Sequence, residues 1–478
     1  MTRPPPAVAM QTAPWLWPTI LVVAFVVLAT AGAVHHTMWR DEIQAWLIAR
    51  DSNGLRDLIW NLRYEGHPPL WHLVLMPLTR FAADPRLMHV PVILCMTAVV
   101  ALVLWRAPMT RVEKILFPFG YFVLFEYGVK SRSYAIGALL LIVFCCLWQQ
   151  RRRHPFLLAA TLVLLAQVHI LCAILAAAAF LAIVAARLWE DGDDSLPGRA
   201  EALATLIFAL GWLAAVALPA HAAITGGATT LPRALWSRLG EIASVSALLG
   251  PSHNALTAVP ALAIIVATLV ALRHRPAALV FLVVALTGTI GVFFAVYGSN
   301  TWHRGLLFLA FIVATWLARI QDPAPTGPGR RLLSGLVLSV LCAQALTGPA
   351  ALWTTAREPL SRARDTAAFI RTMGWEGDPL VGMADDTTSA VVGHLGVARA
   401  FYANAGRWGS FVLWDRRRLV PRSPAELLAE LAAVPTPHTL VARPDFASDL
   451  IAAAGYREMA RFTGATDPLE NYVVWRKP

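Results

Sequence analysis

Charged residues are scarce in this chain of 478 residues. Asp, Glu, Lys and Arg together make up 14% of it, against about 25% in soluble domains. Apolar residues make up 57%, and the mean hydropathy is +0.58. Because so little charge cannot cover a water-exposed surface of this length, the composition excludes a cytosolic enzyme and a disordered scaffold. The lipid bilayer is therefore the expected surrounding of most of the chain.

Cysteine is also scarce, and a glycine-rich phosphate-binding loop is missing from the sequence. The five cysteines lie in apolar stretches without a CxxC pair, which excludes a disulfide-stapled secreted domain. Without a nucleotide-binding motif, no nucleotide donor is expected. The 40 basic residues exceed the 29 acidic ones. The arginines fall in short runs between apolar stretches, which is typical of membrane orientation and not of nucleic-acid binding.

Eleven apolar stretches are candidates to cross a hydrocarbon core of about 30 Å, and the fifth of them is short. The first is too long for a cleaved signal peptide and is expected to remain as a helix. The stretch 156–188 is too long for one helix, so two helices are predicted with a break near His169. The predicted spans are 15–34, 87–105, 113–129, 133–150, 156–168, 169–188, 201–220, 256–273, 276–298, 303–319 and 332–353.

The segment 68–83 decides the orientation of every later span, because counting it as a crossing would invert them all. Its apolar run is short, which favours a helix lying on the membrane surface. The arginine-rich loops at 151–153, 273–275 and 330–331 then fall in the cytoplasm, as the positive-inside rule requires. We therefore predict a multi-pass protein of a bacterial inner membrane, with a cytoplasmic amino terminus and a periplasmic catalytic loop at 35–86.

The composition changes near residue 355, where charges return and apolar runs shorten. Ser423 followed by Glu426 is a capping-box pattern that predicts a helix over 423–433. Short apolar runs predict strands at 379–383, 399–403, 410–414, 439–443 and 472–475. The expected architecture is an all-α polytopic membrane domain with about 11 transmembrane helices over 1–354, followed by a small periplasmic α/β soluble domain over 355–478.

Polar residues cluster at the outer ends of the spans, and the predicted orientation places them on one face. Asp41 and Glu42 follow the first span, where an acidic pair either caps a helix or supplies a general base. Glu65 and His67 close the same loop. They either belong to a turn or ligate a divalent cation, since carboxylate and imidazole are both metal ligands.

Cations on this outer face depart from the positive-inside rule and so indicate a bound anion. Two cations and a phenol in one short turn can donate the hydrogen bonds that a phosphate needs. His169, at the end of the short fifth span, is either a packing residue or a further contact. The residues of this anion-binding group are Arg86, Lys130, Arg132, Tyr134, His303 and Arg304.

The soluble domain offers less pattern. Tyr402, Trp408 and Trp414 are either sugar-binding platforms or core residues. Asp385 and Asp386 are most simply the start of a helix, because Thr and Ser follow them.

The order of these motifs resembles that of the GT-C membrane glycosyltransferases. The branch in question contains protein O-mannosyltransferases, aminoarabinose transferases and rhizobial lipopolysaccharide sugar transferases. The resemblance rests on a long first helix, an outer loop opening with Asp41-Glu42, and a Glu-Gly-His-Pro-Pro-Leu-Trp step at 65–71 into a surface helix. Arg132-Ser133-Tyr134 is similar to an Arg-x-Tyr step of that branch, and the match covers roughly residues 15–320.

The resemblance implies an inverting glycosyltransferase that uses a polyprenyl-phosphate sugar. Asp41 would be the general base and Glu42 its support. His169 would contact donor or acceptor, and Glu65 with His67 would bind a divalent metal in the way some relatives do. Lys130, Arg132, Tyr134 and Arg304, with His303 and Arg86 near them, would hold the donor phosphate. The acceptor, whether a glycan, a lipid or a protein, has no recognisable signature.

Three other classes fit parts of the same pattern. A polymerase or ligase for lipid-linked glycans shares the lipid and the face. A transporter or flippase also carries ionisable groups in the membrane, but the spans show no inverted repeat and the midplane is nearly bare of charge. A non-catalytic polyprenyl-phosphate-binding protein differs from the enzyme only in the role of Asp41.

Overall fold

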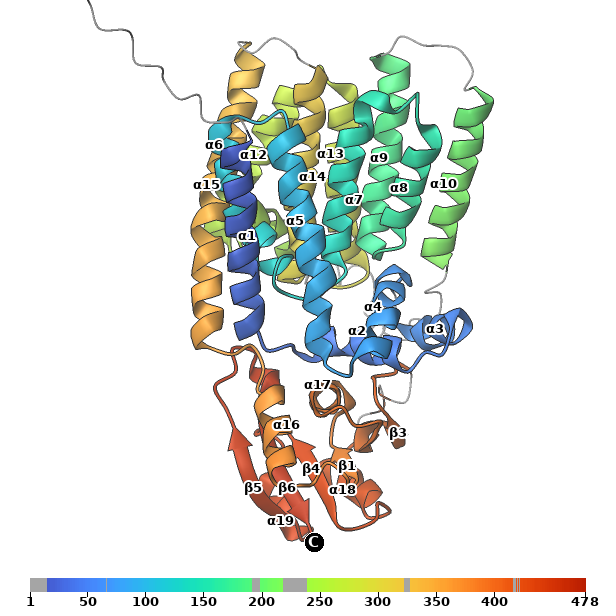
Figure 1. The fold of residues 1–478 in the computed structure, drawn as a ribbon, viewed down its shortest axis with the longest axis vertical. Helices are drawn as coiled ribbons and strands as arrows, with labels where there is room; N and C mark the ends of the chain where they lie inside the picture. The colour runs from blue at the N-terminus through green and yellow to red at the C-terminus, as the bar shows by residue number, and fades with distance from the viewer. Residues whose placement is uncertain are drawn as a thin grey trace, which may run out of the picture.

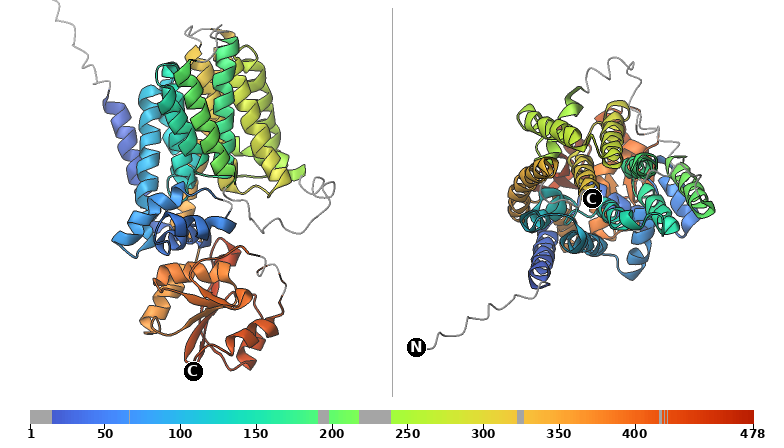
Figure 2. Two further views of the ribbon diagram at one scale, coloured as in Figure 1. Left: turned by 90° about the vertical axis from the view of Figure 1, so that its right-hand side faces the viewer. Right: turned by 90° about the horizontal axis from the view of Figure 1, so that it is seen from above.

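The computed structural model describes residues 15–65, 67–190, 198–217, 239–321, 327–415, 418, 420 and 422–478. The chain forms a long helical bundle, a layer of short helices at one end of the bundle, and a sheet domain beyond that layer (Figure 1). The carboxy terminus lies at the far end of the sheet domain, away from the bundle (Figure 2).

Eight helices among the described residues are long and apolar enough to cross a membrane, and two shorter apolar helices stand among them. Together with one interrupted segment, these helices account for the eleven predicted spans, so the polytopic membrane fold is confirmed. The bundle helices are α1 (Leu16–His35), α5 (His89–Arg106), α7 (Tyr134–Leu147), α8 (Pro155–Ala166), α9 (Ile170–Trp189), α10 (Arg199–Ala217), α12 (Ala255–Leu272), α13 (Pro276–Ala295), α14 (Thr301–Gln321) and α15 (Pro328–Arg357).

The break predicted near His169 is present. Helix α8 ends at Ala166 and α9 begins at Ile170. His169 caps α9, because its Nδ1 accepts a hydrogen bond of 3.1 Å from the Leu171 amide. The imidazole therefore satisfies an amide at a helix start that has no partner within the helix.

The span predicted over 113–129 is interrupted. It consists of α6 (Arg111–Leu116), a 3-10 turn η3 (Phe117–Phe119) and a π-helical turn η4 (Tyr121–Glu126). Pro118 cannot continue a helix, because it lacks an amide hydrogen. The buried side chain of Gln344 on α15 compensates, since its Oε1 accepts from the Phe122 amide at 3.4 Å. The segment thus stays in the bundle although its helical ladder is broken.

Short helices form a layer between the bundle and the sheet domain (Figures 1 and 2). The segment 68–83 contains one of them, α4, which buries Trp71 and Leu75 and exposes Phe81. This two-sided helix lies at the end of the bundle and not within it, while the sidedness of the protein stays a prediction. The elements of the layer are α2 (Arg40–Arg50), α3 (Leu55–Asn61), η1 (Leu62–Tyr64), α4 (Leu70–Phe81) and η2 (Pro85–Met88), and the 3-10 helix η6 (Leu239–Leu248) precedes α12.

The C-terminal domain is a mixed six-stranded sheet with helices on both faces. The strand order is β3-β2-β1-β4-β6-β5, in which β1 pairs in parallel with β2 and β4 and the other pairs are antiparallel. Its elements are α16 (Ala363–Thr372), β1 (Leu380–Gly382), α17 (Asp385–Leu395), β2 (Ala400–Tyr402), β3 (Arg407–Gly409), α18 (Pro424–Leu431), β4 (His438–Ala442), α19 (Ser448–Ala453), β5 (Arg457–Phe462), η9 (Pro468–Glu470) and β6 (Tyr472–Lys477).

Alternate residues of the strands point into two different cores. Leu440 and Val473 pack with residues of α18 and α19, whereas Val441 and Val474 pack on the α16 and α17 side. Such alternation follows from the two-residue period of a strand. The α17 side is continuous with the core of the helical bundle. The C-terminal domain is therefore docked through a hydrophobic contact and not merely tethered.

Three features of the sheet differ from the prediction. Residues 410–414 are not a strand, and neither β3 nor β5 was predicted. The reason for the first is that the amide and the carbonyl of Val412 bond to the side chain of Gln44 and not to a neighbouring strand (both 2.9 Å). The predicted helix after Ser423 is confirmed, and Ser423 Oγ accepts from the Glu426 amide at 3.3 Å.

Candidate active site

A cavity of about 240 Å³ lies where α2, the turn at 131–133, the start of α4 and the C-terminal domain meet. It brings together four residues of the predicted site, and further residues come from both domains. The four predicted residues are Asp41, Glu65, His67 and Arg132; the wall from the C-terminal domain is formed by Asp386, Ser389, Val412 and Trp414.

Asp41 and Arg132 meet at this cavity. Arg132 Nη1 donates to Asp41 Oδ2 at 3.1 Å, although the two residues are 91 positions apart. The Arg132 guanidinium lies over the Trp302 ring, 4.4 Å from its centroid, which holds the cation in place. Both side chains keep some exposure, 32% for Asp41 and 14% for Arg132. The candidate base and a candidate phosphate ligand are thus direct neighbours.

Glu42 lies behind the cavity and fixes its geometry. Its fully buried carboxylate accepts from the Trp39 amide (3.3 Å) and the Ser131 amide (2.5 Å), and it contacts His36 Nε2 (2.8 Å). Burial alone would raise the pKa of Glu42, but His36 and the Ser131 amide outweigh it and hold the pKa at about 2. A permanently charged Glu42 therefore clamps the turn that carries Arg132 onto the first turn of α2.

Lys130 is occupied by a partner that sequence reasoning missed. Its ammonium group contacts both carboxylate oxygens of Glu126, at 3.0 and 3.2 Å. Glu126 also accepts from the Tyr121 hydroxyl at 2.9 Å. Lys130 does not line the cavity. A glutamate four residues before a lysine is a local signal from which this pair could have been found.

Aromatic and imidazole rings connect the remaining predicted residues. His169 is central, with its ring centroid 4.7 Å from that of His67 and 5.6 Å from that of His303. The Tyr134 hydroxyl lies 3.3 Å from His169 Nε2. Because the Leu171 amide donates to Nδ1 of His169, the ring proton stands on Nε2 and points at the tyrosine oxygen. The Tyr134 hydroxyl proton is then available to another acceptor.

Arg304 and Arg86 do not reach the cavity lining. Arg304 is only 6% exposed; its Nη2 donates to Thr301 Oγ1 at 2.9 Å, while its Nε and Nη1 have no hydrogen-bond partner. Arg86 is an exposed residue that pairs with Asp84 at 2.6 Å. The structure therefore places Arg304 as a buried cation near the site and Arg86 on the protein surface.

Glu65 and His67 both line the cavity, and hydrogen bonds within the protein hold each of them. Gln44 Nε2 donates to Glu65 Oε1 at 2.5 Å. Burial, with a smaller effect of the Asp41 charge, raises the pKa of Glu65 to about 7. His67 Nδ1 donates to the backbone carbonyl of Glu65 at 2.6 Å. The described residues contain no group of three or more His, Cys, Asp or Glu that could hold a metal ion.

Two cavity residues of the helical domain were missed from the sequence. Gln44 follows Asp41 by three positions and so shares its helix face, a signal that was readable. His72 lies one residue after Trp71 and is 5% exposed, and its Nδ1 has no hydrogen-bond partner. Burial lowers the pKa of His72 to about 3, so its ring is neutral at physiological pH.

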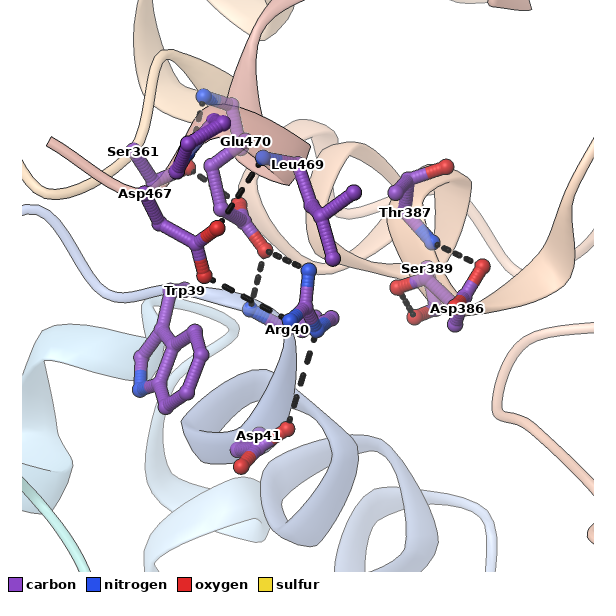
Figure 3. Close-up of polar contacts among 12 residues, drawn as sticks. Trp39, Arg40, Asp41, Ser361, Asp386, Thr387, Ser389, Asp467, Leu469 and Glu470 are labelled. Carbon is purple, nitrogen blue, oxygen red and sulfur yellow. Dashed lines mark hydrogen bonds and ion pairs between the residues drawn. The ribbon is translucent and has the colours of Figure 1, made fainter. Parts of the chain in front are cut away.

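Arg40 ties the start of α2 to the C-terminal domain (Figure 3). Its guanidinium pairs with Asp467 at 3.4 Å and Glu470 at 3.6 Å, and its amide donates to Glu470 Oε1 at 3.2 Å. Glu470 also accepts from Ser361 Oγ (2.6 Å) and the Tyr472 hydroxyl (2.7 Å). Burial raises the pKa of Glu470 to about 7.

The multi-pass bundle, its layer of short helices and the docked C-terminal domain have the fold of a solved GT-C protein, so the predicted fold is confirmed. Among solved structures, the chain is similar to that of ArnT from Cupriavidus metallidurans bound to undecaprenyl phosphate. The TM-score is 0.57 and the identity 12%, over 97% of this chain and 98% of that one. No family profile and no curated protein sequence matches the chain. At this identity the likeness establishes the fold.

Proposed function

We propose that the protein is an integral membrane glycosyltransferase that transfers a monosaccharide from a polyprenyl phosphate to a hydroxyl group of a glycan, lipid or protein acceptor. The observation that carries the proposal is the contact between Asp41 and Arg132 at a cavity in a GT-C fold. A carboxylate and a guanidinium held side by side are suited to proton removal and to phosphate binding. The ligand of ArnT, undecaprenyl phosphate, is the lipid phosphate that such a donor carries and that transfer of its sugar would release.

In this mechanism Arg132 holds the donor phosphate and Asp41 activates the acceptor. Asp41 takes the proton of the acceptor hydroxyl, and the oxygen forms a bond to the anomeric carbon. The bond from that carbon to the phosphate oxygen breaks, and its electron pair leaves on the phosphate, where Arg132 stabilises the charge. Tyr134, which lies behind the cavity lining, supports Arg132, whose guanidinium carbon lies 5.5 Å from the Tyr134 ring centroid. Direct displacement inverts the anomeric configuration.

The ion pair couples donor binding to base activation. Asp41 now occupies one guanidinium nitrogen of Arg132, so a donor phosphate has to compete with it. The negative charge of the donor phosphodiester close to Arg132 also repels the neighbouring carboxylate. Asp41 is thereby released towards the cavity only when the donor is in place. This order of events limits the exposure of a free base to water.

The proposed sidedness places residues 355–478 and the loop 35–86 in the periplasm and the amino terminus in the cytoplasm. Single cysteines at three exposed positions, Asn53, Glu376 and Arg153, test it in a background without the native cysteines. The cysteines at positions 53 and 376 should react with an impermeant thiol reagent in spheroplasts whose inner membrane is intact. The cysteine at position 153 should react only after lysis. The reverse pattern would refute the orientation.

The activity is tested with purified protein in nanodiscs and a panel of radiolabelled undecaprenyl-phosphate monosaccharides. We expect sugar release or transfer from at least one donor. Asp41→Asn should abolish it while binding of undecaprenyl phosphate persists. Binding without turnover of any donor by the wild-type protein would refute the transferase and favour a non-catalytic lipid-phosphate protein or an enzyme of diphosphate-linked glycans.

A further inference from the structure

We infer that the C-terminal domain supplies the acceptor subsite: Asp386, Ser389 and Trp414, called here the distal wall, bind a hydroxyl-rich sugar ring and present it to Asp41. The inference rests on the proposed function and adds the chemical class of the acceptor. All three residues line the same cavity as Asp41. They come from the first two turns of α17 and from the segment 410–415, far from the catalytic loop in sequence.

The distal wall is held rigidly against the catalytic loop. Gln44 bonds both the amide and the carbonyl of Val412, two residues before Trp414. Helix α17 packs on α2 so closely that a Cβ at Gly393 would stand 2.3 Å from Ile43 Cγ2. Two independent contacts therefore fix the two segments that carry the wall. A site formed in this way is pre-organised, as binding sites on rigid elements are.

The chemistry of the distal wall fits a carbohydrate. An indole offers an apolar face to the C–H groups of a sugar ring, and a carboxylate accepts hydrogen bonds from its hydroxyls. Arg418 orients both groups, because it lies 4.2 Å from the Trp414 ring centroid and 3.6 Å from Asp386 Oδ2. Asp386 keeps 28% exposure of its side chain and so retains lone pairs for a ligand. In Figure 3 Asp386 and Ser389 share the start of α17, near Arg40.

The position of the distal wall assigns it to the acceptor and not to the donor sugar. The polyprenyl chain of the donor lies in the bilayer, so its phosphate reaches Arg132 from the side of the bundle. The C-terminal domain stands beyond α2 and α4, on the side away from the bundle (Figures 1 and 2). In a direct displacement the attacking oxygen approaches opposite the leaving phosphate. A ring on the distal wall would thus give its hydroxyl proton to Asp41 and its oxygen to the anomeric carbon.

The test uses full-length protein in nanodiscs and n-octyl β-glycosides of glucose, galactose and mannose as probes, below their micelle concentrations. Saturation-transfer NMR measures binding, and transfer from the donor found in the panel gives the KM for the glycoside. We compare Trp414→Ala, Trp414→Phe and Asp386→Asn. The matched control is Trp408→Ala, because Trp408 lies in the same domain on β3, packs on Phe401 and Arg399 and lies outside the cavity.

We expect Trp414→Ala and Asp386→Asn to raise the Kd and KM for the preferred glycoside about tenfold, and Trp414→Phe to restore most of the loss. The Kd for undecaprenyl phosphate should stay within about twofold, and Trp408→Ala should behave as wild type. Three results would overturn the inference: equal effects of the Trp414 and Trp408 substitutions, distal-wall variants that weaken binding of undecaprenyl phosphate and not of the glycoside, or wild-type protein that binds no glycoside. Absence of turnover would refute the proposed function but not this inference, because the NMR measurement of glycoside binding does not require turnover.

Discussion

Replacing the candidate base should tighten donor binding while it abolishes transfer. Asp41→Asn keeps the shape of the side chain and removes the charge that now occupies Arg132. The pair is partly exposed, with 32% and 14% of the side chains accessible, and such pairs contribute about 1 kcal/mol. Freeing Arg132 should therefore lower the Kd for undecaprenyl phosphate roughly fivefold. Loss of a positioned base should slow transfer roughly 10²- to 10⁴-fold.

Arg132→Ala should have the opposite effect on donor affinity. It removes a charge-assisted contact to phosphate, which contributes about 1.5–3 kcal/mol and corresponds to roughly a tenfold to hundredfold increase in Kd. In the double variant the Asp41 substitution should no longer tighten binding, because the competition for the guanidinium is gone. A double-mutant cycle thus isolates the coupling between base and phosphate ligand.

The measurements are lipid-phosphate titrations and single-turnover transfer rates in nanodiscs. Asp57→Asn on α3 is the matched control, because Asp57 is exposed and lies outside the cavity. Weaker donor binding in Asp41→Asn would refute the idea that Asp41 and the phosphate compete for Arg132. Equal effects of the Asp41 substitution with and without Arg132 would refute it as well.

Three further predictions concern stability, each measured by thermal unfolding in nanodiscs. Gly393→Ala overpacks the contact of α17 with α2 and should cost about 1–3 kcal/mol, whereas Gly377→Ala, which meets open space, should cost little. Burial raises the pKa of Glu470 from 4.5 to about 7. Its protonated form therefore stabilises the fold fully below about pH 4.5, and this contribution to the free energy of unfolding is lost as the pH rises to about 7. The Tm of Glu470→Gln should therefore rise relative to the Tm of the wild type between about pH 5 and about pH 8, and a Tm difference that does not change with pH would contradict this. Glu113→Ala strands the buried Arg319 that it now binds at 2.7 and 2.8 Å, and should cost about 3–5 kcal/mol. The double variant Glu113→Leu/Arg319→Met should be closer to wild type, and a larger loss in the double would count against the reasoning.

The membrane domain could be predicted from the sequence because hydrophobic run length is a local property. The break at His169 followed from bilayer thickness alone. The interruption at Pro118 was not predicted, because the segment is apolar throughout and its broken ladder is completed by Gln344, more than two hundred residues away. Periodicity identifies which residues prefer lipid, whereas the path of the backbone depends on partners that are distant in sequence.

The candidate site was predicted only in part, for a related reason. The predicted orientation of the spans placed Asp41 and Arg132 on one face of the membrane. Their contact, however, depends on Glu42, whose carboxylate holds the Ser131 amide against α2. The pairing of Lys130 with Glu126 was readable from their spacing and was overlooked. Trp414 was predicted as a sugar-binding platform or a core residue and Asp386 as part of a helix start, but their place in the cavity was not predicted, because it results from docking of the C-terminal domain.

The wrong strand at 410–414 shows what docking contributes to the site. Its apolar sequence indicates burial, and burial was interpreted as pairing within a sheet. In the structure the amide and the carbonyl of Val412 are satisfied by Gln44, on the same helix face as Asp41, much as a neighbouring strand would satisfy them. This segment can bury its backbone only when the C-terminal domain is seated on α2, so undocking would leave both groups of Val412 without partners and would remove one wall of the cavity. The cavity is therefore a property of the docked protein, and local sequence patterns fail at the place where the two domains build it together.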